Sequence, residues 1–348
     1  MPRRPLNYLG LFRHGLQALA IALLGGLVLD ATADEGARPP VPIIFDTDME
    51  SDVDDVGALA MLHALADRGE AEILAVMVCA KNPWSAACAN RINTYFGRAQ
   101  LPVGNLQGPG VDRNSRYARQ IADEFPGDLA RGDQAANAVS LYRQILAAQP
   151  DRSVVILSVG YLTNLRDLLQ SRPDDHSELD GNALVRQKVR LWVCMGGQFP
   201  EGREANIRWD ATASVQVLAE WPTEILFSGW KIGTPVMTGR QLAHLPTTSP
   251  VRRAYQLFNN LRPHHSWDQV ATLYAVRGLD GGPAADYWSL SPPGRLIVDP
   301  DDGRNRWQDD PQGNHRYKRA ERPAEPIAEE IDELMMHLPA PEKLRNPH

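Results

Sequence analysis

The sequence has little cysteine, no excess of basic residues, and no long apolar segment beyond its first thirty residues. Three cysteines in 348 residues (Cys79, Cys88 and Cys194) exclude a disulfide-stabilised scaffold and lack the spacing of a metal site. We interpret them as small buried side chains, and a Cys79–Cys88 disulfide is the alternative for two of them. The formal net charge of −7 argues against a nucleic-acid partner. With 43% hydrophobic and 23% charged residues, the composition excludes a disordered chain and a multi-span membrane protein.

The first 33 residues differ from the rest of the chain. Three arginines precede the apolar stretch 15–29, which is shorter than the roughly 20 residues of a membrane-spanning helix. The stretch is followed by Ala31-Thr32-Ala33, an A-x-A cleavage pattern. We therefore expect residues 1–33 to be a signal peptide and residues 34–41 a mobile leader. The mature protein would be periplasmic or secreted and free of the membrane, and an uncleaved anchor is the alternative.

From residue 42 to residue 340, short apolar runs alternate with helical patterns. Runs that are apolar throughout are typical of parallel strands buried on both faces. We therefore predict a single α/β domain over residues 42–340, with a largely parallel open sheet flanked by helices. In such sheets, ligands bind beyond the carboxyl ends of the strands. The predicted strands are 42–45, 73–78, 154–157, 191–194 and 225–227, the clearest helices are 56–66 and 86–96, and the predicted loops are 102–110, 281–294 and 299–315.

The segment after the first predicted strand is strongly acidic. Residues 46–55 hold five aspartates and one glutamate. Carboxylates at this density repel one another unless a cation compensates them, and without cysteine or histidine they favour Ca²⁺ or Mg²⁺ over zinc. The glycine and glutamate of an EF-hand are missing at their required offsets. A solvated helix cap is the alternative, but a cap needs only one or two aspartates.

Five blocks, taken in order, resemble the inosine–uridine-preferring nucleoside hydrolase family. The acidic loop is similar to that family's D-T-D-P-G-x-D-D signature, with two extra residues. The resemblance covers about residues 42–340 and implies that family's Rossmann-like fold. The blocks are Asp46-Thr47-Asp48 with Asp54-Asp55, Asn82 after the second strand, 158–164 (a G-P-L-T-N-like turn), Met195-Gly196-Gly197 with 204–207 (M-G-G…E-x-N-I), and 267–271 (H-D-P-x-A).

The resemblance implies a Ca²⁺ site and a general base. The metal ligands would be Asp48, Asp55, the backbone carbonyl of Val159, and Asp268. Hard carboxylate and carbonyl oxygens at strand ends suit this ion. Asp48 would also accept a proton from the metal-bound water that attacks the anomeric carbon.

The resemblance also implies a set of substrate-binding residues. Asp54 and Asn206 would hydrogen-bond the ribose hydroxyls, Glu204 the far end of the sugar, and Asn82 would lie near the sugar or the base. Each residue has a structural alternative. Glu204 and Asn206 could be a surface charge and a loop cap, and Asp268 could cap a helix over residues 269–276.

Two departures from the family pattern concern the substrate. Trp267 stands where the family has a histidine that protonates the leaving base, and an indole cannot serve as that acid. His264 and His265 are alternative donors, and Trp84 or Trp267 could instead stack on a base as a substrate-binding residue. The link 198–203 lacks the asparagine with which family members often bind the sugar, so recognition of the 5′ end is open.

These observations predict Ca²⁺-dependent hydrolysis of the N-glycosidic bond of a ribonucleoside to base and ribose. The alternatives are a hydrolase of another ribosyl-like compound and a catalytically weak ribosyl-binding protein on the same fold. The expected partner is a small-molecule nucleoside, whose base the sequence does not specify. Homo-oligomers are common in the family, but no interface patch is evident in the sequence.

Overall fold

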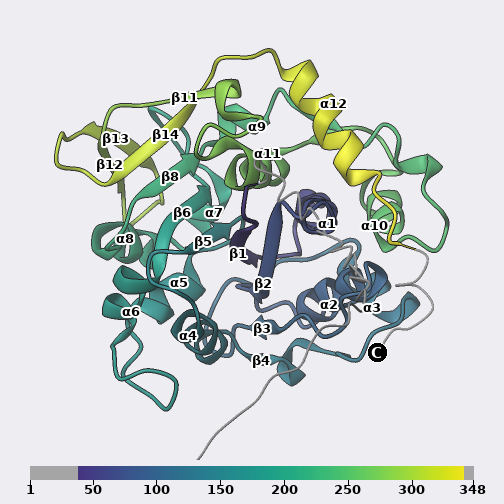
Figure 1. Ribbon diagram of the computed structural model, residues 1–348, viewed down its shortest axis with the longest axis horizontal. Helices are drawn as coiled ribbons and strands as arrows, with labels where there is room; N and C mark the ends of the chain where they lie inside the picture. The colour runs from purple at the N-terminus through teal and green to yellow at the C-terminus, as the bar shows by residue number, and fades with distance from the viewer. Residues whose placement is uncertain (1–37, 341–348) are drawn as a thin grey trace, which may run out of the picture. The chain divides into compact units, whose positions relative to one another are not determined.

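A twelve-stranded sheet organises residues 38–340, the part of the chain that the computed structural model describes (Figure 1). Residues 39–340 belong to one compact unit. The parallel part of the sheet runs in the order β4 (Ala136–Asn137), β3 (Val103–Asn105), β2 (Ala71–Val78), β1 (Val41–Thr47), β5 (Val154–Ser158), β6 (Val189–Met195), β8 (Ile225–Ser228) and β14 (His315–Ala320). Antiparallel strands complete it: β12 (Gly294–Val298), β13 (Asn305–Asp309), β7 (Glu201–Gly202) and, beside β14, β11 (Trp288–Leu290). A separate pair consists of β9 (Met237–Thr238) and β10 (His264–His265).

Helices cover both faces of the sheet (Figure 1). One face carries α1 (Asp54–Asp67), α2 (Ser85–Tyr95), α3 (Ala118–Glu124), α10 (Pro250–Asn259), α11 (Trp267–Leu273) and α12 (Ala324–Met335). The other carries α4 (Ala138–Ala148), α5 (Thr163–Leu169), α6 (Gly181–Lys188), α7 (Ala205–Trp209) and α8 (Ala211–Glu220). Short elements are α9 (Trp230–Gly233), the 3-10 turns Gly132–Gln134, Leu242–His244 and Ala285–Tyr287, and a π-helical turn, Tyr274–Gly278, after α11.

The core explains why the strands are apolar throughout. In β1, the side chains of Ile43 and Phe45 join the hydrophobic cluster beneath α1 and α11, whereas Ile44 joins the cluster beneath α4 and α5. Successive residues of a strand point to opposite faces, so a strand covered on both faces buries every side chain. The predicted strands and helices, the parallel sheet and the α/β class are confirmed.

The predicted loops were partly wrong. Residues 102–110 contain β3, residues 281–294 contain β11 and a 3-10 turn, and residues 299–315 contain β13. These strands are short or polar, and pairing with a neighbour rather than apolar patterning creates them: β13 forms a hairpin with β12. Val41, assigned to the mobile leader, is the first residue of β1. The predicted signal peptide (1–33) and residues 34–37 lie outside the described residues.

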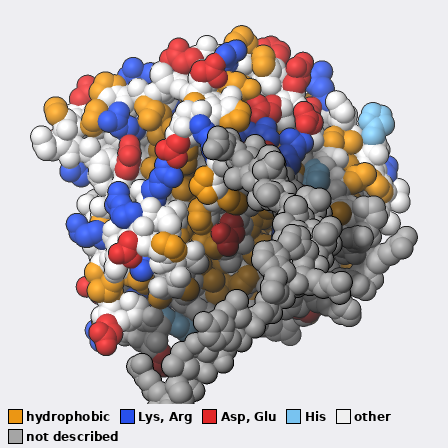
Figure 2. Space-filling model, viewed as in Figure 1, with side chains coloured by type: hydrophobic (Ala, Val, Ile, Leu, Met, Phe, Trp, Pro, Cys, Tyr) orange, Lys and Arg blue, Asp and Glu red, His pale blue; other side chains and the backbone are white. Residues whose placement is uncertain are grey.

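Three further observations concern cysteines, membrane contact and surface charge. Cys79, Cys88 and Cys194 are buried and unpaired, as the interpretation of small core side chains required, and the Cys79–Cys88 bridge is absent. Within residues 38–340, no helix combines the length and apolar character needed to cross a membrane. On the described part of the face in Figure 2, acidic and basic side chains are interspersed rather than gathered by sign.

Candidate active site

A cavity of about 160 Å³ lies at the carboxyl ends of four neighbouring strands, β1, β5, β6 and β8. The strand order turns outward in both directions from β1 and β5, and ligands bind in the crevice that such a reversal opens. The cavity's lining is rich in acidic and aromatic side chains. Its lining consists of Asp48, Ser51, Asp52, Asp54, Asp55, Val159, Met195, Glu204, Ala205, Asn206, Trp209, Trp230, Trp267 and Asp268.

Hydrogen bonds fold the acidic loop back onto the first turn of α1. The Asp55 carboxylate accepts from the Thr47 hydroxyl and from the Met49 N–H, the latter at 3.1 Å. The Asp48 carboxylate accepts from the Glu50 N–H, also at 3.1 Å. Met49 takes a left-handed conformation, with φ of 49°, and thereby reverses the chain. The loop thus presents Asp48 and Asp55 from fixed positions.

Gly160 lets the end of β5 approach this loop closely. A Cβ atom at this position would lie 2.5 Å from the Asp48 nitrogen and 2.7 Å from the Cys79 sulfur. Both distances are far below van der Waals contact, and the first involves backbone that cannot rotate away. Only glycine therefore allows the Val159 carbonyl and Asp48 to share one site.

Three buried carboxylates of the lining lie close together. One oxygen each of Asp54, Asp55 and Asp268 lies within 4.8 Å of the other two. Asp268 stands in the first turn of α11, and its N–H donates to Asp54 Oδ2 at 3.1 Å. Asp48 lines the same cavity without belonging to this group of three. Residues from the first loop and from far along the chain therefore meet, as the strand-end argument predicted.

The electrostatics of this centre call for a cation. Burial, and then repulsion by neighbouring carboxylates, raises the pKa of Asp48, Asp54 and Asp268 well above the ordinary range. Burial likewise raises the pKa of Asp55 to about 7. The cavity lining contains no lysine or arginine that could compensate these charges. Buried carboxylate oxygens without basic partners fit a hard divalent cation.

Asn206 and Glu204 link the strand ends to α7. The Asn206 side-chain amide donates to the Val159 carbonyl at 3.0 Å and to the Met195 carbonyl at 3.2 Å. Because a carbonyl has two lone pairs, the bond to Val159 leaves one free for a cation. Glu204 caps α7 by accepting from the Asn206 and Ile207 N–H groups, and it also accepts from the Gly197 N–H. Glu204 is therefore a cap that also lines the cavity.

The residues considered for the leaving base occupy different environments. The Trp267 indole lines the cavity, but its N–H donates to the Trp230 carbonyl and to Thr234 Oγ1, each at 3.0 Å. His264 Nε2 lies 2.6 Å from Oδ1 of the cavity residue Asp52, and His265 Nδ1 lies 2.6 Å from the Thr234 carbonyl. Neither histidine is among the lining residues.

Two predicted neighbours of the substrate lie outside the cavity lining. Asn82 forms a turn, accepting from the Trp84 N–H at 3.0 Å and donating to the Arg113 carbonyl at 3.1 Å. Trp84 packs against the guanidinium groups of Arg119 and Arg131 instead.

The alternative of a helix cap at Asp268 is wrong, because α11 begins one residue earlier and Ser266 holds the cap position.

Sequence reasoning missed two tryptophans that line the cavity, Trp209 and Trp230. Trp230 follows β8 almost directly, so the strand-end rule applied to that strand would have found it. The rings of Trp230 and Trp267 stack with 6.5 Å between centroids. Trp209 ends α7, five residues after Glu204, and no motif marks it.

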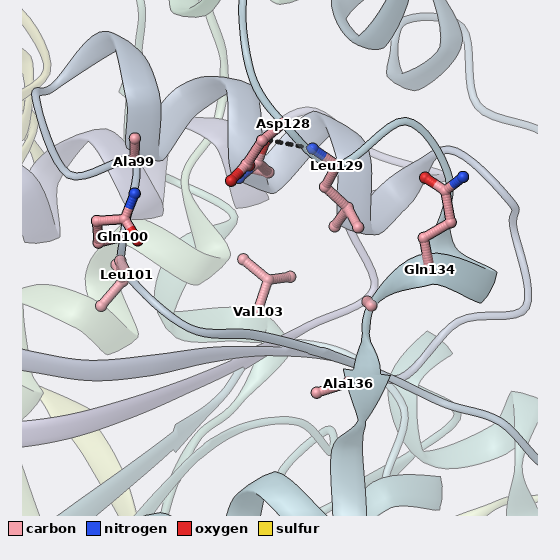
Figure 3. Close-up of a pocket in the computed structure, with 10 residues that line it drawn as sticks. Ala99, Gln100, Leu101, Val103, Asp128, Leu129, Gln134 and Ala136 are labelled. Carbon is pink, nitrogen blue, oxygen red and sulfur yellow. Dashed lines mark hydrogen bonds between the residues drawn. The ribbon is translucent and has the colours of Figure 1, made fainter. Parts of the chain in front are cut away.

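A larger cavity beside β3 lacks these chemical features. It measures about 340 Å³, and Figure 3 shows mainly aliphatic and amide side chains around it. Its only lining carboxylate, Asp128, accepts from the Asn90 amide at 2.8 Å. None of the predicted site residues lines it, so the acidic cavity is the candidate active site.

Known proteins share this fold. A plant nucleoside hydrolase, PpNRh1, superimposes with a TM-score of 0.62 at 19% identity, over 86% of this chain and 99% of its own. The purine-preferring ribonucleoside hydrolase from Gardnerella vaginalis gives 0.63 at 16% identity, over 85% and 99%. The architecture is that of a nucleoside hydrolase.

Sequence comparison gives the family. Residues 43–306 match the family described as inosine-uridine preferring nucleoside hydrolase, and the chain belongs to that family. The pyrimidine-specific ribonucleoside hydrolase RihA of Shewanella sp. strain ANA-3 is 31% identical over 218 residues. This match spans 58% of the present chain and 60% of RihA.

Proposed function

We propose that this protein hydrolyses the N-glycosidic bond of a ribonucleoside, releasing base and ribose, with Ca²⁺ as its cofactor. The observation that carries the proposal is the meeting of Asp48, Asp54 and Asp55 with Asp268 in one cavity, 214 residues separating Asp54 from Asp268. Membership of the nucleoside hydrolase family supports the reaction class.

The residues that would hold the cation are Asp48, Asp55, Asp268 and the carbonyl of Val159. Asp54 is close enough to be a further ligand, since its oxygen lies within 4.8 Å of those of Asp55 and Asp268. All the offered atoms are oxygens, which favours Ca²⁺ or Mg²⁺ over softer metals. When bound, the cation would offset the carboxylate charge and make the attacking water more acidic.

Asp48 would serve as the general base. It lies at the end of β1, and the Glu50 N–H fixes one of its carboxylate oxygens, Oδ1. The other oxygen can accept a proton from water as that water attacks C1′ of the ribose. Asp54 and Asn206 would hydrogen-bond the ribose hydroxyls, and Glu204 would stay mainly a cap that shapes the cavity.

The leaving base would be held by aromatic contact rather than protonated by Trp267. The Trp267 N–H is already donated to Trp230 and Thr234, so the indole offers its face to a planar base. His264 is the candidate proton donor, because its Nε2 lies 2.6 Å from Oδ1 of Asp52, which lines the cavity.

A second candidate is a ribosyl-binding protein with weak turnover, or a hydrolase of another ribosyl-like compound. The absence of a histidine from the described cavity lining favours it, because departure of the base is slower without an acid. The presence of Asp48, Asp54, Asp55 and Asp268 in the lining of one cavity favours hydrolysis.

Release of ribose from a panel of purine and pyrimidine nucleosides, with and without Ca²⁺, tests these candidates. Hydrolysis of nucleosides that stops with chelator and returns with Ca²⁺ supports the proposal. Nucleoside binding by calorimetry without ribose release identifies the binding protein. Activity that persists undiminished after chelation contradicts the metal assignment.

We also propose that the protein is exported and acts in the periplasm or outside the cell. The basic head, short apolar stretch and A-x-A pattern of residues 1–33 support this. Mass spectrometry of the protein from its host should find a mature N-terminus near Asp34, and an intact N-terminal segment would contradict cleavage.

A further inference from the structure

We propose that the substrate carries a phosphate on the 5′ carbon of its ribose, and that Arg113 and Arg208 bind this phosphate beside Trp209. This inference rests on the proposed function and narrows its substrate class. Two substrates have this chemistry: a nucleoside 5′-monophosphate, and a nucleoside whose 5′ oxygen carries a diphosphate ester.

Two arginine side chains lie against the ring of Trp209, a residue that lines the cavity. Its half-buried indole lines the cavity, and the ring contacts Tyr161 edge to face at 5.9 Å between centroids. The Arg113 Cζ lies 4.2 Å from the Trp209 ring centroid, and the Arg208 Cζ lies 5.1 Å from it. The two arginines come from distant segments, the loop after β3 and helix α7, and meet on one ring.

The backbone fixes both arginines while their charged groups stay available. The Arg113 N–H donates to Glu50, and the Arg113 carbonyl accepts from Asn82. Arg208 belongs to α7, and the backbone of Gly303 packs against it. Within residues 38–340, neither guanidinium forms an ion pair or a side-chain hydrogen bond, and both are exposed.

Other arginines of the same region are already engaged. Arg203 donates to the Asp302 carbonyl at 2.9 Å, and Arg166 pairs with Asp167 at 2.7 Å. A guanidinium that packs on an indole keeps its N–H groups directed outward, in the fork that matches phosphate oxygens. Arg113 and Arg208 therefore retain donors that the protein itself does not use.

Charge determines where an anionic substrate group can lie. The cavity lining holds five aspartates and one glutamate and no basic side chain, which disfavours a phosphate inside it. Trp209 shares α7 with Asn206, which we assign to the ribose hydroxyls, and α7 begins at Glu204. The stacked Trp230 and Trp267 provide the surface for the base. The sugar's 5′ end is thereby directed towards Trp209 and its two arginines.

The sequence supports this direction of the sugar. The link 198–203, which often supplies a sugar-binding asparagine in the family, has none here. A substrate bound through a charged 5′ group has less need for that neutral contact.

The reaction itself does not involve the phosphate. Water adds its hydroxyl to C1′, the C1′–N bond breaks, and the base leaves with the electron pair and a proton. A nucleoside 5′-monophosphate therefore yields ribose 5-phosphate.

Calorimetry on the full-length Ca²⁺-loaded protein tests the site with ribose and ribose 5-phosphate as probes. Charge-assisted hydrogen bonds from two arginines should make ribose 5-phosphate bind about tenfold to a hundredfold more tightly than ribose at low salt. Salt should shrink this ratio because both guanidiniums are exposed. The double variant Arg113→Gln/Arg208→Gln should bring ribose 5-phosphate down to the affinity of ribose.

Arg131→Gln is the matched control. Arg131 is also an exposed arginine on a tryptophan, with its Cζ 4.9 Å from the ring of Trp84, which does not line the cavity. It should leave the ratio unchanged. The same proteins should be assayed for base release from a nucleoside, its 5′-monophosphate and its 5′-diphosphate ester, which distinguishes the two phosphate sources.

The outcomes separate this inference from the proposed function. Equal affinity for ribose and ribose 5-phosphate, in a protein that hydrolyses nucleosides, overturns the phosphate site and leaves the hydrolase intact. An Arg131→Gln effect equal to that of the double variant also overturns it. If the protein binds neither sugar and releases no base from any substrate, the proposed function itself fails.

Discussion

The carboxylate of Asp54 accepts a hydrogen bond from the backbone N–H of Asp268, with 3.1 Å between Oδ2 and N. This bond joins the first turn of α1 to the first turn of α11, and both residues are almost fully buried. Because each helix carries part of the acidic group, the bond sets the separation of carboxylates that are 214 residues apart in the chain.

Replacing Asp54 should separate its structural role from its charge. We expect Asp54→Ala to lower the free energy of unfolding by about 1–3 kcal/mol, because it leaves the buried Asp268 N–H without an acceptor. Asp54→Asn keeps an acceptor oxygen and removes one of several repelling charges, so it should lose less. Denaturant unfolding in the presence of chelator measures both. Equal losses in the two variants would contradict the role of this hydrogen bond.

Asp48→Asn should remove most of the activity. An amide cannot accept the proton of the attacking water, and we expect kcat to fall by about 10²–10⁴. Asp133→Asn, a change at an exposed aspartate outside the cavity, is the control. Ribose release per enzyme, after circular dichroism confirms folding, gives the comparison. Undiminished kcat in Asp48→Asn would exclude it as the general base.

Trp267→Ala should weaken substrate binding without removing an acid from the pH–rate profile. The indole supplies a surface for the base, whereas its N–H is committed to Trp230 and Thr234. We expect a higher KM and an unchanged acid limb. His264→Asn is the companion variant, and a limb lost only there would identify the Asp52–His264 pair as the proton source.

His315 should make the protein less stable at acidic pH. Burial, aided by the charge of Arg295, lowers the pKa of His315 from 6.5 to about 4, and its Nδ1 accepts from the Leu296 N–H at 2.9 Å. Between pH 6.5 and about pH 4, His315 is therefore protonated in the unfolded chain but neutral in the folded chain. The contribution of neutral His315 is complete above that pH and falls by ~3 kcal/mol as the pH approaches 4.

Comparing wild type with His315→Asn isolates this residue from the other titrating groups. The asparagine oxygen can replace Nδ1 as acceptor for Leu296 and does not titrate. Unfolding free energies at pH 7 and pH 4.5 should differ less in the variant than in the wild type. The same pH dependence in both proteins would contradict a depressed pKa at His315.

The apolar strands could be predicted from the sequence because the fold buries them on both faces. The last five residues of β1 and every residue of β5 are buried. By contrast, β3 is three residues long and β13 is Asn305–Asp309, a polar run in which most residues are exposed. Such strands are defined by their partners' N–H and C=O groups, which leave no pattern in the chain itself.

The acidic part of the site was predictable for a similar reason. Aspartates that follow a buried strand must lie at its carboxyl end, whatever the loop conformation. Asn82 also follows a strand, yet its amide turns towards Trp84 and Arg113, because the direction of a side chain depends on tertiary contacts. Arg208 precedes Trp209 on α7, but Arg113 reaches the same ring only through packing of α7 against the loop after β3.

We expect the three buried thiols to resist alkylation while the protein is folded. Burial raises the pKa of Cys79, Cys88 and Cys194 above the ordinary range, so almost no thiolate forms. These are all the cysteines of the chain, and Cys79 lies against Gly160 beneath the acidic loop. The rate at which a thiol reagent labels them would consequently report how often the core opens. The rate at Cys79 would report opening of the loop that carries the carboxylates.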